Sequence, residues 1–182
     1  MPPETSSEPT QDTAQIANKI AALLRAEHFS TGSRAALRRM APADLAEPAL
    51  QRMLADYVPD HWLENSGMAD WGLIVHALAL ASPDRLTEAR PLGAALQQAE
   101  YSESRLARLL QANRAQLNDL IPRACRFLAA KGEALHAADL AYFVRAISSL
   151  KPEQTAMART KIARDFYRAA RKTDALSSQT QD

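Results

Sequence analysis

Valine, glycine, cysteine and aromatic residues are all scarce in this chain of 182 residues. It holds three valines and five glycines, whereas alanine, leucine, arginine and glutamine are abundant. Because β-branched residues favour strands and the abundant residues favour helices, this bias argues against a sheet-based fold. The hydrophobic share of 47% argues against a disordered chain. We therefore predict an all-α protein, a compact bundle of eight or nine helices with disordered termini.

The single cysteine, Cys125, excludes an intrachain disulfide and has no second thiol with which to hold a metal. This cysteine usage suits a reducing compartment. Residues 1–12 are acidic and polar and contain no apolar segment of the kind that export signals need. No stretch of the chain approaches a membrane span. We therefore expect a soluble, cytoplasmic protein.

Motifs for catalysis and for cofactor binding are also missing. The sequence contains no phosphate-binding loop, nucleophile elbow or dinucleotide fingerprint. Its four histidines lie far apart, and none is spaced from another histidine, a cysteine or an acid as zinc ligands are: His28, His61, His76 and His136. His76 lies inside an apolar run, which favours a core histidine. We expect a protein that is not an enzyme and uses no cofactor and no metal.

Proline, glycine and capping residues divide the rest of the chain into helical segments whose apolar residues recur at helical spacing. Residues 13–172 are expected to form the helical domain, as one unit or as two helical halves, between a disordered head, 1–12, and a disordered tail, 173–182. The first six predicted helices cover 13–27, 33–41, 48–58, 68–81, 91–99 and 102–117. A segment with a kink or a fresh start near Pro122 follows and ends at Gly132. The last two are a helix that contains 140–147 and ends before Pro152, and a helix over 152–172.

The net charge of +1 hides an uneven distribution. Ten acids oppose three bases in residues 41–104, whereas residues 105–131 hold six bases and one acid, as do residues 159–172. Seventeen of the 22 basic residues are arginines, whose planar guanidinium group binds phosphate in a bidentate manner. In residues 159–172 the bases spread around the predicted helix, which favours a solvated face there.

Residues 30–40 read STGSRAALRRM and place three arginines and no acid in one predicted helix. With Ser33 as the predicted N-cap, these arginines stand in the first turns, where a cation opposes the helix macrodipole by roughly 0.3 to 1 kcal/mol. Arg34 and Arg38 lie one turn apart, and Arg39 diverges from Arg38 by about 100°. Because no acid is present to form i,i+4 pairs, the pattern favours phosphate contact over a solvated face.

A second group of arginines, at positions 105, 108 and 114, follows a leucine stripe in the next basic stretch. Glu100 and Glu103 precede this group and are close enough in sequence to pair with it locally. Phosphate binding and local ion pairing are therefore both open for Arg105, Arg108 and Arg114.

Two stretches, GSRAALRRM and, about fifty residues further on, PLGAALQQAEYSESRLARLLQANR, carry a family resemblance. They are similar to the CasB-type small subunit of the type I-E CRISPR Cascade complex. That family shows a Gly-Asp-Arg-Ala-x-Leu-Arg-Arg opening, a Leu-Gly-x-Ala-Leu helix and a Ser-Glu-x-Arg-x-x-x-Leu-Leu-x-Ala-x-Arg segment in this order. The resemblance runs from about Ala22 to Tyr167, with Ser33 in place of the family's Asp.

The resemblance implies an all-helical, non-catalytic subunit of a crRNA-guided surveillance complex for antiviral defence, present in more than one copy. Its implied partners are crRNA, target DNA with its displaced non-target strand, the backbone and large subunits, and a second copy of itself. Contacts with strand backbones would stabilise the R-loop. By position, Arg39, Arg105 and Arg114 match the family's basic positions, and Arg38 and Arg123 match less closely. The residues that we predict to bind nucleic acid are Arg34, Arg38, Arg39, Arg105, Arg108, Arg114 and Arg123.

Two other classes of protein fit parts of the pattern. A helical adaptor would bind only protein and would pair its arginines with acids of a partner. A small DNA-binding regulator would use a helix-turn-helix, yet the sequence offers no convincing helix pair with polar, base-reading residues on its second helix.

Overall fold

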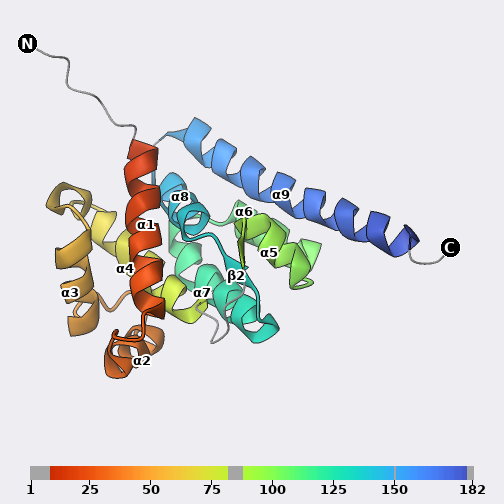
Figure 1. The fold of residues 1–182 in the computed structure, drawn as a ribbon. Helices are drawn as coiled ribbons and strands as arrows, with labels where there is room; N and C mark the ends of the chain where they lie inside the picture. Colours follow the sequence, from red (N-terminus) through yellow and green to blue (C-terminus); the bar gives the residue numbers. More distant parts are fainter. Residues whose placement is uncertain (1–8, 82–87, 150, 180–182) are drawn as a thin grey trace, which may run out of the picture.

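The computed structural model describes residues 9–81, 88–149 and 151–179 (Figure 1). The described residues form nine α-helices, one short 3-10 helix and two strands of two residues each, which confirms the predicted all-α fold. The predicted disorder of residues 1–8 and 180–182 lies outside the described residues. Helix α1 already begins at Pro9 and α9 reaches Gln179, so helix extends beyond the predicted range of 13–172 at both ends. The division into domains stays a prediction.

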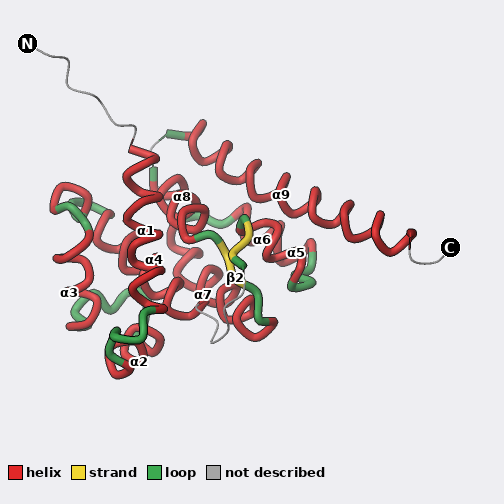
Figure 2. Tube along the Cα trace, in the orientation of Figure 1, coloured by secondary structure: helices red, strands yellow, loops and turns green. Residues whose placement is uncertain are grey.

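The helices follow one another with short connections, and the two strands pair in parallel (yellow in Figure 2). In chain order the elements are α1 (Pro9–Arg25), α2 (Thr31–Arg39), α3 (Pro48–Tyr57), the 3-10 helix η1 (Asp60–Trp62), α4 (Gly67–Ala81), β1 (Ala89–Arg90), α5 (Leu92–Gln98), α6 (Glu103–Gln111), α7 (Arg114–Lys131), β2 (Ala134–Leu135), α8 (Ala137–Ser148) and α9 (Pro152–Gln179).

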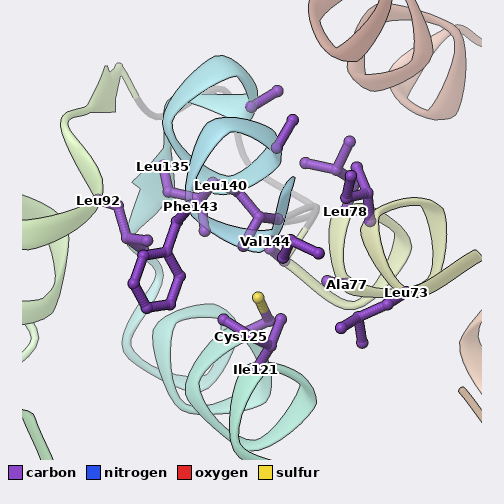
Figure 3. Close-up of a cluster of buried hydrophobic side chains, with 14 of the residues drawn as sticks. Leu73, Ala77, Leu78, Leu92, Ile121, Cys125, Leu135, Leu140, Phe143 and Val144 are labelled. Carbon is purple, nitrogen blue, oxygen red and sulfur yellow. The ribbon is translucent and has the colours of Figure 1, made fainter. Parts of the chain in front are cut away.

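Helix α4 is the centre of the core. Its sequence is apolar on nearly every side, and the structure buries it against α1, α2, α7 and α8. Figure 3 shows side chains of α4, α7 and α8 converging, among them Ala77, Cys125 and Phe143. Cys125 is fully buried, and this burial raises the pKa of its thiol to about 12. The thiol is therefore inert in the folded state.

The sequence predicts a kink or a fresh start near Pro122. Helix α7 runs past this proline without interruption, so the fresh start is wrong. A proline inside a helix removes one hydrogen bond, but Ile121, Ala124 and Cys125, within three residues of it, are buried in the core. Tertiary packing thus holds the helix together across the weak point. The helix ends as predicted at Gly132, whose φ of 73° is the left-handed conformation that favours glycine.

The last helix, α9, lies mainly along α5 and extends past it (Figure 1). Gly93 makes this contact possible, because a Cβ atom there would overlap the carbonyl oxygen of Ile162 and lie 2.8 Å from the amide nitrogen of Phe166. Asp139 of α8 adds a polar link: it accepts hydrogen bonds from the Leu92 amide, at 3.2 Å, and from Lys161 Nζ, at 2.9 Å. Helices α5, α8 and α9 are thus joined at one carboxylate.

Candidate nucleic-acid interface

Helix α2, which carries the first group of arginines, begins earlier than predicted. Its N-cap is Ser30, whose Oγ accepts a hydrogen bond from the Ser33 amide at 3.3 Å, so the prediction of Ser33 as the cap is wrong. Both serines suit an N-cap, but the earlier one allows the helix to begin at Thr31. Arg38 and Arg39 consequently lie in the last turn, where a cation is favourable to the macrodipole. The predicted dipole conflict is therefore also wrong.

Arg34 is engaged within the fold. Its Nε donates to the carbonyl oxygen of Leu24 at 2.9 Å, and its Nη2 donates to that of Ala26 at 3.0 Å. The Leu24 carbonyl lies in the last turn of α1, where helix carbonyls have no intrahelical partner, and the Ala26 carbonyl follows the end of this helix. The guanidinium group also lies over the ring of Phe29, 5.8 Å from its centroid. Arg34 therefore joins α2 to the end of α1.

Arg38 and Arg39 are adjacent in sequence but have different surroundings. Arg38 is half-buried, and its Nε donates to the carbonyl oxygen of Ala79 in α4 at 2.9 Å. Arg39 is exposed, and within the described residues its side chain forms no hydrogen bond or ion pair. Of the α2 arginines, Arg39 is thus the one that presents its whole guanidinium group to an external partner.

Arg114 pairs with a buried acid. Its Nε lies 2.6 Å from Oδ1 of Asp70, and its Nη1 donates to Asn118 Oδ1 at 2.7 Å. Ser148 donates to the same Asp70 oxygen at 2.7 Å. Because a buried carboxylate without a cation is costly, Arg114 is needed by the fold itself. Its predicted role in nucleic-acid binding stays a prediction.

Arg123 forms an i,i+4 ion pair with Asp119, at 2.8 Å between Nε and Oδ1. Both side chains are more than half exposed, at 64% and 55%. Exposed pairs of this kind contribute only about 0.3 to 0.5 kcal/mol, so the pair is weak enough for a phosphate to replace it.

Helix α6 presents two exposed arginines next to a lysine of α7. Arg105 and Lys131 lie over the ring of Phe127, at 5.6 and 6.0 Å from its centroid. Arg108 is one helical turn from Arg105 and is also exposed. Arg105, Arg108 and Lys131 are called here the α6 basic patch. Sequence reasoning missed Lys131 and Phe127, although their i,i+4 spacing on α7 was a usable signal.

The acids that precede the α6 basic patch have other partners. Glu100 accepts a hydrogen bond from Lys131 at 2.9 Å, which lowers the pKa of its carboxyl group. Glu103 accepts one from the Tyr167 hydroxyl at 3.4 Å. The local ion pairs that the sequence left open for Arg105 and Arg108 are therefore not formed in the described structure.

The charge of the two arginines also acts on a buried neighbour, Tyr101. Its ring packs edge-to-face on Phe127, with 5.4 Å between centroids. Burial raises the pKa of the Tyr101 hydroxyl, and the positive charges of Arg105 and Arg108 oppose that rise. The fold thus gathers positive charge around one aromatic pair.

The two groups of exposed arginine come from different parts of the fold. Helix α2 packs on α3 and α4, whereas α6 packs on α7 and α9 (Figure 1). Arg39 and the α6 basic patch are thus two separate candidate contact points.

Two further observations concern other kinds of site. Across the described ranges, no three or more His, Cys, Asp or Glu side chains are grouped in a way that could hold a metal ion. None of the helices in the described part of the chain has the length and apolar character needed to cross a membrane.

The structure is that of an all-α protein with several arginines that are exposed and form no ion pair among the described residues: Arg39, Arg105 and Arg108. The chain belongs to the CRISPR-associated protein Cse2 family, whose model matches residues 33–167. The resemblance seen in the sequence motifs is thereby confirmed. No curated protein sequence matches this chain significantly.

Solved structures with the same fold include two CasB proteins and a subunit of a larger assembly. CasB of M. ruber is 22% identical, with a TM-score of 0.66, over 89% of this chain and 98% of the other. CasB of Thermobifida fusca is 18% identical, with a TM-score of 0.63, over 86% and 96%. A chain of a CRISPR RNA-guided surveillance complex is 21% identical, with a TM-score of 0.63, over 92% and 98%.

Proposed function

We propose that this chain is a non-catalytic, nucleic-acid-binding subunit of a crRNA-guided Cascade complex. In that role it contacts the backbones of the guide-target duplex and the displaced non-target strand and so stabilises the R-loop. Its partners are crRNA, target DNA, the backbone and large subunits and a second copy of itself. Membership of the Cse2 family supports this role, as does the fold shared with a chain of a CRISPR RNA-guided surveillance complex.

The observation that carries the proposal is the α6 basic patch. Arg105 and Arg108 are exposed, while Glu100 and Glu103, the acids closest to them in sequence, bind Lys131 and Tyr167 instead. Exchange of a DNA duplex for a guide heteroduplex is nearly balanced in free energy, so a few phosphate contacts suffice to shift it. Such contacts read charge and not sequence.

The seven predicted residues divide by their surroundings. We propose direct phosphate contact for Arg39, Arg105 and Arg108, which are exposed and have no ion pair among the described residues. Arg123 joins them once phosphate replaces its weak pair with Asp119. The remaining three form hydrogen bonds within the protein and stabilise the fold: Arg34, Arg38 and Arg114.

The test is the salt dependence of single-stranded DNA binding by the full chain. Replacing Arg105→Ala with Arg108→Ala should lower the magnitude of the slope of log K against log salt by about 0.7 for each lost contact. Circular dichroism should be unchanged, because neither side chain has an ion pair in the described fold. Arg52→Ala, an exposed arginine of α3, is the matched control and should leave the slope close to that of the wild type.

A folded double variant that binds with the wild-type slope would contradict the proposal. Strong preference for one DNA sequence would favour a small DNA-binding regulator instead. Absence of nucleic-acid binding together with binding to an acidic protein would favour the helical adaptor. In an assembled complex, the double variant should also form R-loops less readily on relaxed DNA than the wild type.

A further inference from the structure

A half-buried arginine of α8 lies over both tryptophans of the chain. The guanidinium carbon of Arg145 is 4.9 Å from the ring centroid of Trp62 and 5.7 Å from that of Trp71. The two indole rings are stacked, 6.1 Å apart and 12° from parallel. Trp62 ends the 3-10 helix η1, and Trp71 is buried in α4. Two neighbouring elements, η1 and α4, and the distant helix α8 thus build one platform.

Arg145 and Trp62 line a cavity of about 540 Å³ between η1, α4, α8 and the start of α9. This volume is in the range of small-molecule sites. Lys151 and His61 line the same cavity. Among the described residues, neither the guanidinium group of Arg145 nor the ammonium group of Lys151 has a hydrogen bond or a close ion pair. Their donors are available to a ligand.

Two cations and two carboxylates line this cavity, and one of the carboxylates is already neutralised by Arg114. The buried carboxylate of Asp70 also lines it, but this group already binds Arg114 and Ser148. Burial lowers the pKa of Arg145, and the nearby charge of Asp70 opposes this shift. Glu64, exposed at the cavity, is the acid that opposes an anionic ligand.

We infer that this cavity binds one nucleotide of a single strand, with its phosphate between Arg145 and Lys151 and its base beside the indole of Trp62. The inference rests on the proposed function and names a site for the single strand. Stacking on an aromatic ring tolerates any base, because every base has a π-face. An acidic peptide would use the two cations but would leave the aromatic platform without a role, so we favour the nucleotide.

Tryptophan fluorescence of the full chain is a direct reporter of this site. The chain has two tryptophans, and both belong to the platform, whereas the α6 basic patch contains none. Titration with a thymidine trinucleotide should quench the fluorescence saturably, and thymidine monophosphate should do so more weakly. Inorganic phosphate should not quench but should compete with the trinucleotide. Trp62→Phe should remove most of the quenching.

Substitutions of the charged residues at the cavity test whether each cation contacts the ligand or only supports the fold. Arg145→Gln should raise the Kd for quenching by about tenfold, as expected for loss of a charge-assisted contact, and Arg145→Lys should restore part of the affinity. Lys151→Ala should raise the Kd by about threefold, and Glu64→Gln should lower it. Arg52→Gln, on exposed α3, is the matched control and should leave the Kd unchanged.

Four results would overturn the inference. The first is that a labelled strand binds, as detected by fluorescence anisotropy, but does not quench the tryptophan fluorescence. This result would contradict the site and would leave the proposed function unaffected. A second is an equal Kd for quenching in the wild type and in folded Arg145→Gln. If Arg145→Gln does not fold, an equal Kd for quenching in the wild type and in Lys151→Ala, a variant of an exposed residue, is the second result instead. A third is loss of the quenching in the control variant Arg52→Gln, which should keep it. The fourth is tighter binding of oligoglutamate than of the trinucleotide, which would identify a protein ligand.

Discussion

Three arginines within one turn and a half of helix have three different environments. Arg34 binds carbonyls at and just after the end of α1, Arg38 binds a carbonyl of α4, and Arg39 is exposed. A guanidinium group has five N–H donors, so it can serve backbone carbonyls as well as phosphate. At the scale of the residue, the fold therefore decides which arginines are left for a partner.

Single alanine substitutions at the two neighbouring arginines should separate these roles. Arg38→Ala should lower the free energy of unfolding by about 1.5 to 3 kcal/mol, because it removes a part-buried, charge-assisted hydrogen bond to Ala79. Arg39→Ala should lower it by only about 0.5 kcal/mol, since a cation in the last turn is mildly favourable. Urea unfolding followed by far-UV circular dichroism measures both. An equal loss, or a gain in stability for either variant, would contradict this assignment.

At the scale of the element, the glycine of the PLGAALQQA motif has a packing role. Gly93 lets α5 approach the backbone of α9 at Ile162 and Phe166 so closely that no side chain fits between them. Gly32, in α2, has more room, because a Cβ atom there would lie 3.6 Å from Ser30 Oγ, an ordinary contact. The two glycines form a natural matched pair.

Gly93→Ala should cost about 3 kcal/mol of the free energy of unfolding, because the new methyl group meets backbone atoms that cannot rotate away. Gly32→Ala should raise stability by about 0.5 kcal/mol, since it reduces the entropy of the unfolded chain without strain. Urea unfolding measures both, and limited proteolysis should show earlier cleavage in α9 of the first variant. Wild-type stability in Gly93→Ala would show that α5 and α9 are not packed at this distance.

At the scale of the whole molecule, one buried histidine links stability to pH. His76 is buried in α4, and its Nδ1 donates to the carbonyl oxygen of Leu37 in α2 at 2.7 Å. Its Nε2 is buried and has no hydrogen-bond partner within the described residues. Burial lowers the pKa of His76 below its ordinary 6.5, and the nearby positive charge of Arg126 acts in the same direction.

The free energy of unfolding should therefore fall in acid. Because the folded-state pKa is below that of the unfolded chain, the contribution of His76 is complete above pH 6.5. It is lost as the pH falls through the folded-state pKa, with a slope of at most about 1.4 kcal/mol per pH unit. Urea unfolding between pH 7.5 and 5 measures this slope, and His76→Gln should flatten it. A wild-type slope that persists in the variant would assign the effect to other groups.

Much of the fold was predictable because its signals are local. Pro48, Ser102 and Gly132 begin or end helices where the sequence indicates, and an all-round apolar run predicts that α4 is buried. Three local signals misled. Ser30 and Ser33 are equally good caps, and Pro122 usually ends a helix. The helix predicted over 102–117 is divided in two, because Asn113 forms a capping box that begins α7.

The candidate interface was predictable only in part. The sequence identifies the basic stretches and, through the family motifs, the exposed residues Arg39 and Arg105. It contains no sign that Arg145 would meet Trp62 and Trp71, because these three residues come together only when α8 folds onto α4 and η1.

The sequence by itself determined the helical composition, most of the breaks between helices, the lack of known catalytic motifs and the positions of the arginines. Helix propensity, caps and breakers act over a few residues, so they can be read locally. Only the tertiary structure decided what each arginine does. Arg38 meets Ala79 and Arg114 meets Asp70 across 41 and 44 positions of sequence, whereas Arg105 meets no acid among the described residues. A charge finds its partner through the packing of whole helices, and that packing depends on every buried side chain at once.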